Sequence, residues 1–217
     1  MNIDRIVQKY FHGAGKLPLI EVFDENNIHD VFVDVVSVLK SNPEIELGVL
    51  QILSYCLYEI LDNVITHSTK SCGTVLSSYL KEANTIKILV ADDGIGIHKS
   101  LMENKEYSSI TEEEAIMCCV EDKVTDGKGM GFGLYSTARM VQSIGIQFEI
   151  HSGAHLLSYN SGSFSISSAP LWQGTIVYIE IHSNKEISPN EIVDNRTDVE
   201  VEFTDEFINI DEIELLW

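Results

Sequence analysis

Four glycines at alternate positions, followed directly by a helical pattern, constrain this chain more than any other feature. The stretch 126–139 reads D-G-K-G-M-G-F-G-L-Y-S-T-A-R, which places Gly127, Gly129, Gly131 and Gly133 two residues apart. Glycines let backbone N–H groups converge on an anion, and the start of a helix adds a favourable dipole. The run therefore predicts a phosphate cradle at the beginning of a helix.

The composition favours a folded, acidic protein. Hydrophobic residues make up 44% of the 217 positions, enough for a sizeable core. The formal net charge is −20 and only 14 residues are Lys or Arg, so we expect neither nucleic acid nor an anionic membrane as a partner. We find no signal-peptide pattern, no apolar run near the roughly 18 residues of a membrane span and no C-x-x-C pair. A cytoplasmic protein with reduced thiols is expected.

Hydrophobic periodicity predicts a mixture of helices and strands. Helices are expected at about 27–40, 44–68, 111–121 and 132–143, and strands at about 17–23, 73–81, 85–90, 146–151, 156–159, 163–167 and 175–182. The polar segment 98–128 is long enough to be a lid or binding loop. This order predicts a two-layer α+β sandwich with an N-terminal segment (1–43), a core (44–184) and an acidic C-terminal extension (185–217).

The helix predicted at 44–68 contains the sequence Y-E-I-L-D-N-V-I-T-H-S (58–68). Glu59 and Asn63 are four residues apart, so they share one helix face beside the apolar stripe. An amide oxygen suits magnesium where a triphosphate already supplies negative charge, and a carboxylate can accept a proton from water or a hydroxyl. The alternative for both residues is an ordinary solvated helix face.

A third feature, V-A-D-D-G-I-G-I (90–97), stands at the end of a predicted strand. A buried Asp92 carboxylate can accept a hydrogen bond from an exocyclic amine such as that of adenine, and Gly94 and Gly96 let a flat ring approach the backbone. The alternative is a plain Asp-Gly turn. A Gly-Thr pair at Gly174 and Thr175 precedes the last predicted core strand.

Taken together in this order, the four features resemble the GHKL ATPase family of gyrase B, heat-shock chaperones, histidine kinases and mismatch-repair ATPases. The resemblance covers about residues 47–182. It implies the Bergerat fold, with a mixed, mostly antiparallel sheet and helices on one face. It also implies that the protein binds ATP together with Mg²⁺.

The resemblance implies a role for each site residue. Glu59 would be the general base, Asn63 the magnesium ligand and Asp92 the reader of the adenine amine. Thr175 would support the adenine contact through water. The other nucleotide-binding positions that it implies are Gly94, Gly96, Lys128, Gly129, Met130, Gly131, Phe132, Gly133 and Leu134.

Within the family, the chain looks most like the anti-sigma factor serine kinases, which pair Glu with Asn on this helix. That likeness implies a homodimer with an ATP-ordered lid that phosphorylates a serine of a small STAS-type antagonist. The added hairpin at about 155–170 and the acidic extension depart from this pattern. We expect a stand-alone Mg-ATP-binding regulatory protein kinase or slow ATPase. The alternative is a non-hydrolysing, ATP-gated protein-interaction module.

Three further features have two interpretations each. A lysine of the lid is either a contact of the γ-phosphate or an ordinary surface charge, and Lys128 is a better candidate for the contact than Lys123. His67, one turn beyond Asn63, is expected to be a packed or capping histidine rather than a catalytic one. The stretch 186–217 carries eleven acidic residues and one basic residue. It is either a solvated extension or, as its alternation at 199–203 favours, a segment that docks on its own domain or on a partner.

Overall fold

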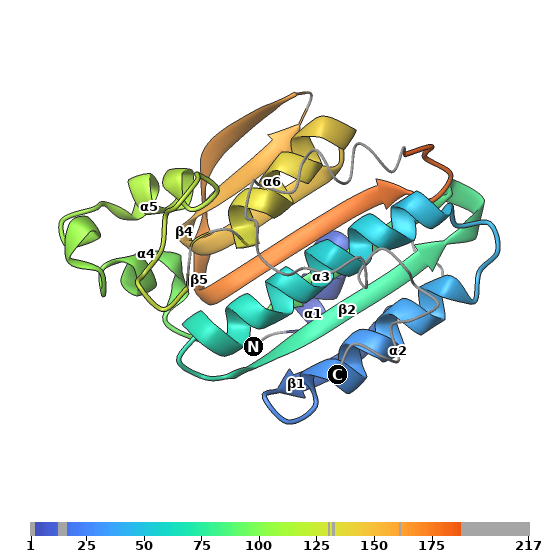
Figure 1. Cartoon of the computed structure of the whole chain (residues 1–217), viewed down its shortest axis with the longest axis horizontal. Helices are drawn as coiled ribbons and strands as arrows, with labels where there is room; N and C mark the ends of the chain where they lie inside the picture. The colour runs from blue at the N-terminus through green and yellow to red at the C-terminus, as the bar shows by residue number, and fades with distance from the viewer. Residues whose placement is uncertain (1–2, 13–16, 130, 132, 161, 188–217) are drawn as a thin grey trace.

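The computed structural model describes residues 3–12, 17–129, 131, 133–160 and 162–187 of the chain (Figure 1). In chain order, the elements are α1 (Ile3–Tyr10), β1 (Leu19–Asp24), α2 (Ile28–Lys40), α3 (Leu47–His67), β2 (Cys72–Leu80), η1 (Lys81–Ala83), β3 (Thr85–Ala91), α4 (Gly96–Leu101), η2 (Lys105–Tyr107), α5 (Glu112–Cys118), α6 (Gly133–Ile144), β4 (Gln147–Asn160) and β5 (Ser163–His182).

The strands form one five-stranded sheet in the order β1-β2-β3-β5-β4. All pairings among the described strands are antiparallel, so the sheet is antiparallel rather than mixed. The α+β sandwich expected from the sequence is confirmed. In the central pair, Ala91 of β3 lies opposite Ile176 of β5. This register brings the next residue of the first strand, Asp92, beside Thr175 of the second.

Helices α2, α3 and α6 cover one face of the sheet (Figure 1). Leu57, Ile60 and Val64 of α3 lie in this core, as the predicted stripe requires. Among the described residues, α3 is the one helix with the length and hydropathy of a membrane span. Its apolar residues pack against the sheet, as those of a core helix in a folded domain do.

Helix α1 packs on part of the opposite face of the sheet, against residues of β2, β3 and β5, so the helices are not confined to one face. This helix was not predicted. Its Ile6 and Tyr10 are buried against Leu89 and Tyr178 of the sheet, and the Tyr10 and Tyr178 rings have centroids 4.6 Å apart. A second, smaller core therefore lies behind the sheet.

The added hairpin is the continuation of β4 and β5 beyond the rest of the sheet. The four strands expected between residues 146 and 182 are two long strands, with irregular register near Gly153. Leu157 and Tyr159 on one side of the hairpin are buried in the main core. The lid segment holds α4, η2 and α5 rather than a single helix. Thr111 and Glu114 form a capping box at the start of α5.

Candidate functional site

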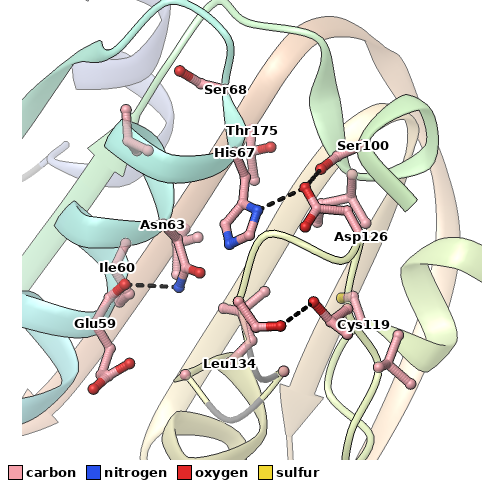
Figure 2. A pocket seen from close by; sticks show the side chains of 18 of the residues that line it. Glu59, Ile60, Asn63, His67, Ser68, Ser100, Cys119, Asp126, Leu134 and Thr175 are labelled. Atoms are coloured by element: carbon pink, nitrogen blue, oxygen red, sulfur yellow. Dashed lines mark hydrogen bonds and ion pairs between the residues drawn. The ribbon is translucent and has the colours of Figure 1, made fainter. Parts of the chain in front are cut away.

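A cavity of about 400 Å³ opens between α3, the ends of β3 and β5, the lid segment and the start of α6 (Figure 2). This volume suits a cofactor-sized ligand. Glu59 and Asn63 line the cavity beside Gly133, whereas the paired Val90 and Val177 line it at the ends of β3 and β5. Among the residues that line it are Glu59, Asn63, His67, Asp92, Gly96, Ser100, Asp126, Gly129, Gly131, Gly133, Leu134 and Thr175.

Helix α3 contributes three polar side chains on successive turns of one face, Glu59, Asn63 and His67 (Figure 2). The Asn63 amide nitrogen donates to the Glu59 carbonyl oxygen at 2.7 Å, and its Oδ1 faces the cavity. Burial, reinforced by the nearby Asp62 carboxylate, raises the pKa of Glu59 to about 7. A carboxyl with this pKa can exchange protons near neutral pH.

The glycine run brings backbone against this helix face. A Cβ at Gly133, the first residue of α6, would lie 2.6 Å from Glu59 Oε2 and 3.3 Å from Asn63 Nδ2. Gly131 has φ +77°, and a Cβ there would lie 2.6 Å from the Val124 carbonyl oxygen. The backbone can therefore pass this close only without side chains. The predicted positions Met130 and Phe132 lie outside the described residues.

Asp92 stands at the opposite, apolar end of the cavity. Its carboxylate accepts hydrogen bonds from the N–H groups of Gly94 at 2.7 Å and Thr175 at 3.1 Å. Burial raises the pKa of Asp92 to about 6, although these two hydrogen bonds act in the opposite direction. Val90 and Val177 line the cavity beside it. A flat apolar group with one exposed amine matches these surroundings.

The two glycines after Asp92 have different positions. Gly96 lines the cavity with φ +77°, and a Cβ there would lie 2.8 Å from Ser152 Oγ. That hydroxyl accepts from the Ile97 N–H and donates to the Gly174 carbonyl oxygen. Gly94 packs instead on the backbone of Ser68, where no side chain would fit, and does not line the cavity. Gly94 therefore allows the tight turn after Asp92 but does not border the cavity.

A hydrogen-bond network that the sequence did not predict ties the lid to α3. The Asp126 carboxylate accepts from His67 Nδ1 and from the Ser100 hydroxyl, each at 2.7 Å (Figure 2). Although burial alone would raise it, the hydrogen bonds from Ser100, the Lys128 N–H and His67 leave the pKa of Asp126 below its ordinary value. The Nε2 of His67 faces the cavity, so His67 is a site residue and not merely a packed one.

The two candidate lysines lie outside the cavity wall. Lys128 Nζ is 2.8 Å from Glu103 and 3.8 Å from Asp126, and its ammonium group is engaged within the lid. Lys123 is exposed and lies 3.9 Å from Asp122. Neither lysine lines the cavity in this structure.

The cavity carries three carboxylates, those of Glu59, Asp92 and Asp126. A polyphosphate would enter this acidic space only with donors and a cation to offset its charge. The described residues hold no cluster of three acidic, His or Cys side chains fit to bind a metal ion by itself. The Asn63 oxygen therefore fits a magnesium ion whose other ligands are phosphate and water oxygens.

A protein-family model matches most of this chain. The family model described as "Histidine kinase-, DNA gyrase B-, and HSP90-like ATPase" matches residues 48–185. The matched range begins at the second residue of α3 and ends after β5, so it contains every element of the cavity. No curated protein gave a significant match.

Proposed function

Because the chain belongs to the histidine kinase-, DNA gyrase B- and HSP90-like ATPase family and is an ATP-binding protein of that type, we propose that it transfers the γ-phosphoryl group of ATP, as a regulatory protein kinase or a slow ATPase. One observation carries this proposal. The Glu59 carboxylate lies against Gly133, where the glycine run enters α6. A base at the phosphate end of the cavity is what a reacting hydroxyl or water requires.

The two ends of the cavity would bind different parts of ATP. The Asp92 carboxylate would accept a hydrogen bond from the adenine amine. Gly96 would lie beneath the ring, and Thr175 would support the contact. The backbone N–H groups of Gly129, Gly131 and Gly133 would hold the phosphates, helped by the N-terminal dipole of α6. Magnesium, held through Asn63, would neutralise phosphate charge when bound.

Glu59 has the right ionisation for a base that works near neutral pH. With a pKa of about 7, it is partly ionised at pH 7 and largely ionised above pH 8. We therefore expect turnover to rise with pH through about 7. Asp62→Asn removes a neighbouring negative charge that raises the Glu59 pKa, so it should move this rise to lower pH while retaining turnover.

The test of the proposal is Glu59→Gln. This variant should lower phosphate release by about 100-fold or more, the usual contribution of a general base. Its ATP affinity by titration calorimetry should stay within about two-fold, because Asn63 and the glycine run remain. An equal loss of binding and turnover would make Glu59 a structural residue. Asn63→Ala, measured with and without magnesium, separately tests the metal contact.

A second candidate function is an ATP-gated protein-interaction module without significant hydrolysis. The observation in its favour is the Asp126 network, which joins the lid to α3 at the cavity wall. A ligand that changes this junction would change the surface that the lid presents. Absence of phosphate release from the intact protein, with and without candidate partners, would select this alternative.

The acceptor of the phosphoryl group is a further part of the proposal. The Glu59–Asn63 pair on α3 supports a likeness to anti-sigma factor serine kinases, and so a STAS-type antagonist as acceptor and a homodimer as the active form. Incubation with γ-labelled ATP and a panel of such antagonists tests this directly. Label found only in free phosphate would instead indicate an ATPase.

A further inference from the structure

A tryptophan of β5, next to the added hairpin, contacts Asp92 from outside the cavity. The indole Nε1 of Trp172 donates to the carbonyl oxygen of Asp92 at 3.1 Å. Trp172 belongs to β5, at the register irregularity where it lies opposite Gly153 of β4. It does not line the cavity, so this contact cannot be a direct ligand contact.

Asp92 is held at all its backbone and side-chain polar groups. Its N–H donates to the Thr175 carbonyl oxygen at 2.9 Å, and its carboxylate accepts from Gly94 and Thr175. The indole engages the one remaining group, the carbonyl oxygen. Between the two partners on β5 lies Gly174 with φ +91°, where a Cβ would be 2.3 Å from that oxygen. The orientation of Asp92 therefore depends on a short stretch of β5.

The other side of Trp172 is fixed by apolar packing. Like Ile3 and Val7 of α1, the half-buried indole packs against the second core, whose members include Ala91 and Ile176. Ala91 is the residue that precedes Asp92. The indole is thus held by the back face of the sheet, while its N–H group reaches the turn that opens into the cavity.

We propose that Trp172 is a positioning residue for base recognition, which sets the orientation of Asp92 by binding its carbonyl oxygen. The inference rests on the proposed function, in which Asp92 accepts the adenine amine. The contact acts on the base end alone, because the phosphate-binding glycines lie on the lid and α6. Loss of the indole N–H should therefore weaken selection of the base and leave phosphate binding unchanged.

The test compares Trp172→Phe with the neighbouring Leu171→Ala. Phenylalanine keeps an aromatic ring against the second core and removes the donor, whereas Leu171 is 81% exposed and serves as the matched control. Titration calorimetry would use magnesium complexes of ATP, inosine triphosphate (which lacks the amine) and tripolyphosphate. Trp172→Phe should weaken ATP binding about three- to ten-fold, the effect of one hydrogen bond. The other two affinities should change less than about two-fold.

The outcomes separate this inference from the proposed function. An intact protein that binds ATP and inosine triphosphate equally would overturn base reading by Asp92, and the role of Trp172 with it. An intact protein that discriminates, with unchanged discrimination in Trp172→Phe, would overturn the role of Trp172 alone. An equal loss for all three ligands would also overturn it, since that indicates a general structural role.

If Trp172→Phe fails to fold, a measurement on the native Trp172 side chain still tests the proposal. The chain has two tryptophans, Trp172 and Trp217. Trp217→Phe therefore leaves a single indole N–H resonance in a nitrogen-correlated NMR spectrum. That resonance should shift on addition of Mg-ATP and not on addition of magnesium tripolyphosphate. No shift with ATP at saturation, or the same shift with both ligands, would contradict the proposal.

Discussion

At the scale of single residues, two glycines of the same run should respond very differently to a methyl group. A Cβ at Gly133 would lie 2.6 Å from the Glu59 carboxylate, whereas one at Gly129 would meet nothing nearer than the His67 ring at 3.9 Å. Neither position has the positive φ that penalises alanine. Gly133→Ala should therefore disturb the phosphate end of the cavity far more than Gly129→Ala.

We expect Gly133→Ala to weaken ATP binding at least ten-fold, about 1.4 kcal/mol, and Gly129→Ala to change it less than about three-fold. Calorimetry gives the affinities, and circular dichroism shows whether α6 is retained. Alanine is a better helix former than glycine by about 1 kcal/mol, so the helix itself should not be lost. Equal effects of the two substitutions would show that the close contact with Glu59 does not shape the site.

The ionisation of Asp92 predicts how ATP binding depends on pH. The Asp92 carboxyl must be ionised so that both of its oxygens can accept hydrogen bonds, including one from the adenine amine. Its pKa is about 6, against an ordinary value of 3.8. A raised pKa means that the folded protein binds the proton more tightly than the unfolded chain. This group's effect on stability is therefore most favourable at low pH and is lost as pH rises through about 6, at a cost of about 3 kcal/mol.

ATP affinity should accordingly fall as the pH drops from 7 to 5, and the affinity for inosine triphosphate should fall less. Calorimetry over this range at constant ionic strength measures both. In Asp92→Asn, the difference between the two nucleotides should disappear, because an amide cannot accept from the amine and from both N–H donors at once. A pH dependence that is identical for the two nucleotides would contradict the assignment of the base end.

At the scale of elements, a buried carboxylate ties the lid to α3. Asp126 lies between His67 on α3 and Ser100 on α4, and its side chain is 1% exposed. Asp126→Asn should destabilise the fold by about 1–3 kcal/mol, because it weakens hydrogen bonds to a charged acceptor. The folded-state pKa lies below 3.8, so this contribution is present above that pH and is lost as the pH falls further.

Hydrogen exchange followed by mass spectrometry can locate the effect. Asp126→Asn should speed exchange across 98–128 and leave the β2–β3 hairpin unchanged. Asp122→Asn, in the same segment but half-exposed and 3.9 Å from Lys123, should change neither. Uniformly faster exchange in the sheet would mean that Asp126 stabilises the whole domain rather than the lid.

The elements differ in how far local sequence determines them. The long helices α2, α3 and α6 follow apolar periodicity, and the glycine run and the D-x-G-x-G turn indicate the two ends of the cavity. Helix α1 has the same periodicity in Ile3, Ile6, Val7 and Tyr10 but spans only eight residues. Such a short pattern is marginal by itself, because its stability comes from packing on the sheet.

The missed parts of the site are non-local. His67 and Asp126 are 59 positions apart and Trp172 and Asp92 are 80 apart, and neither contact leaves a spacing pattern in the sequence. A histidine one turn beyond Asn63 does lie on the same helix face, and this was the available signal for His67. Trp172 carried no such signal, because its place opposite Gly153 arises only when β4 and β5 pair.

At the scale of the whole molecule, the net charge of −20 sets a background repulsion against which the fold is stable. Part of this charge lies outside the described residues, since removal of residues 188–217 would change the formal charge from −20 to −11. Salt screens repulsion between exposed charges over a Debye length of about 10 Å at 0.1 M. The thermal stability should therefore increase with ionic strength.

We expect the melting temperature to rise by several degrees between about 0.01 and 0.3 M sodium chloride, and the rise to be about half as large after deletion of 188–217. Scanning calorimetry of both chains gives the two slopes. The deletion leaves Ile187, which contacts Gly48 at the start of α3, so core packing is preserved. If the slopes are equal, the described domain rather than the acidic extension carries the repulsion.

Magnesium chloride at matched ionic strength, added with ATP, should raise the melting temperature of both chains further, because ligand binding adds to screening. This additional increase should vanish in Asn63→Ala, which separates the metal at the cavity from the charge of the molecule as a whole.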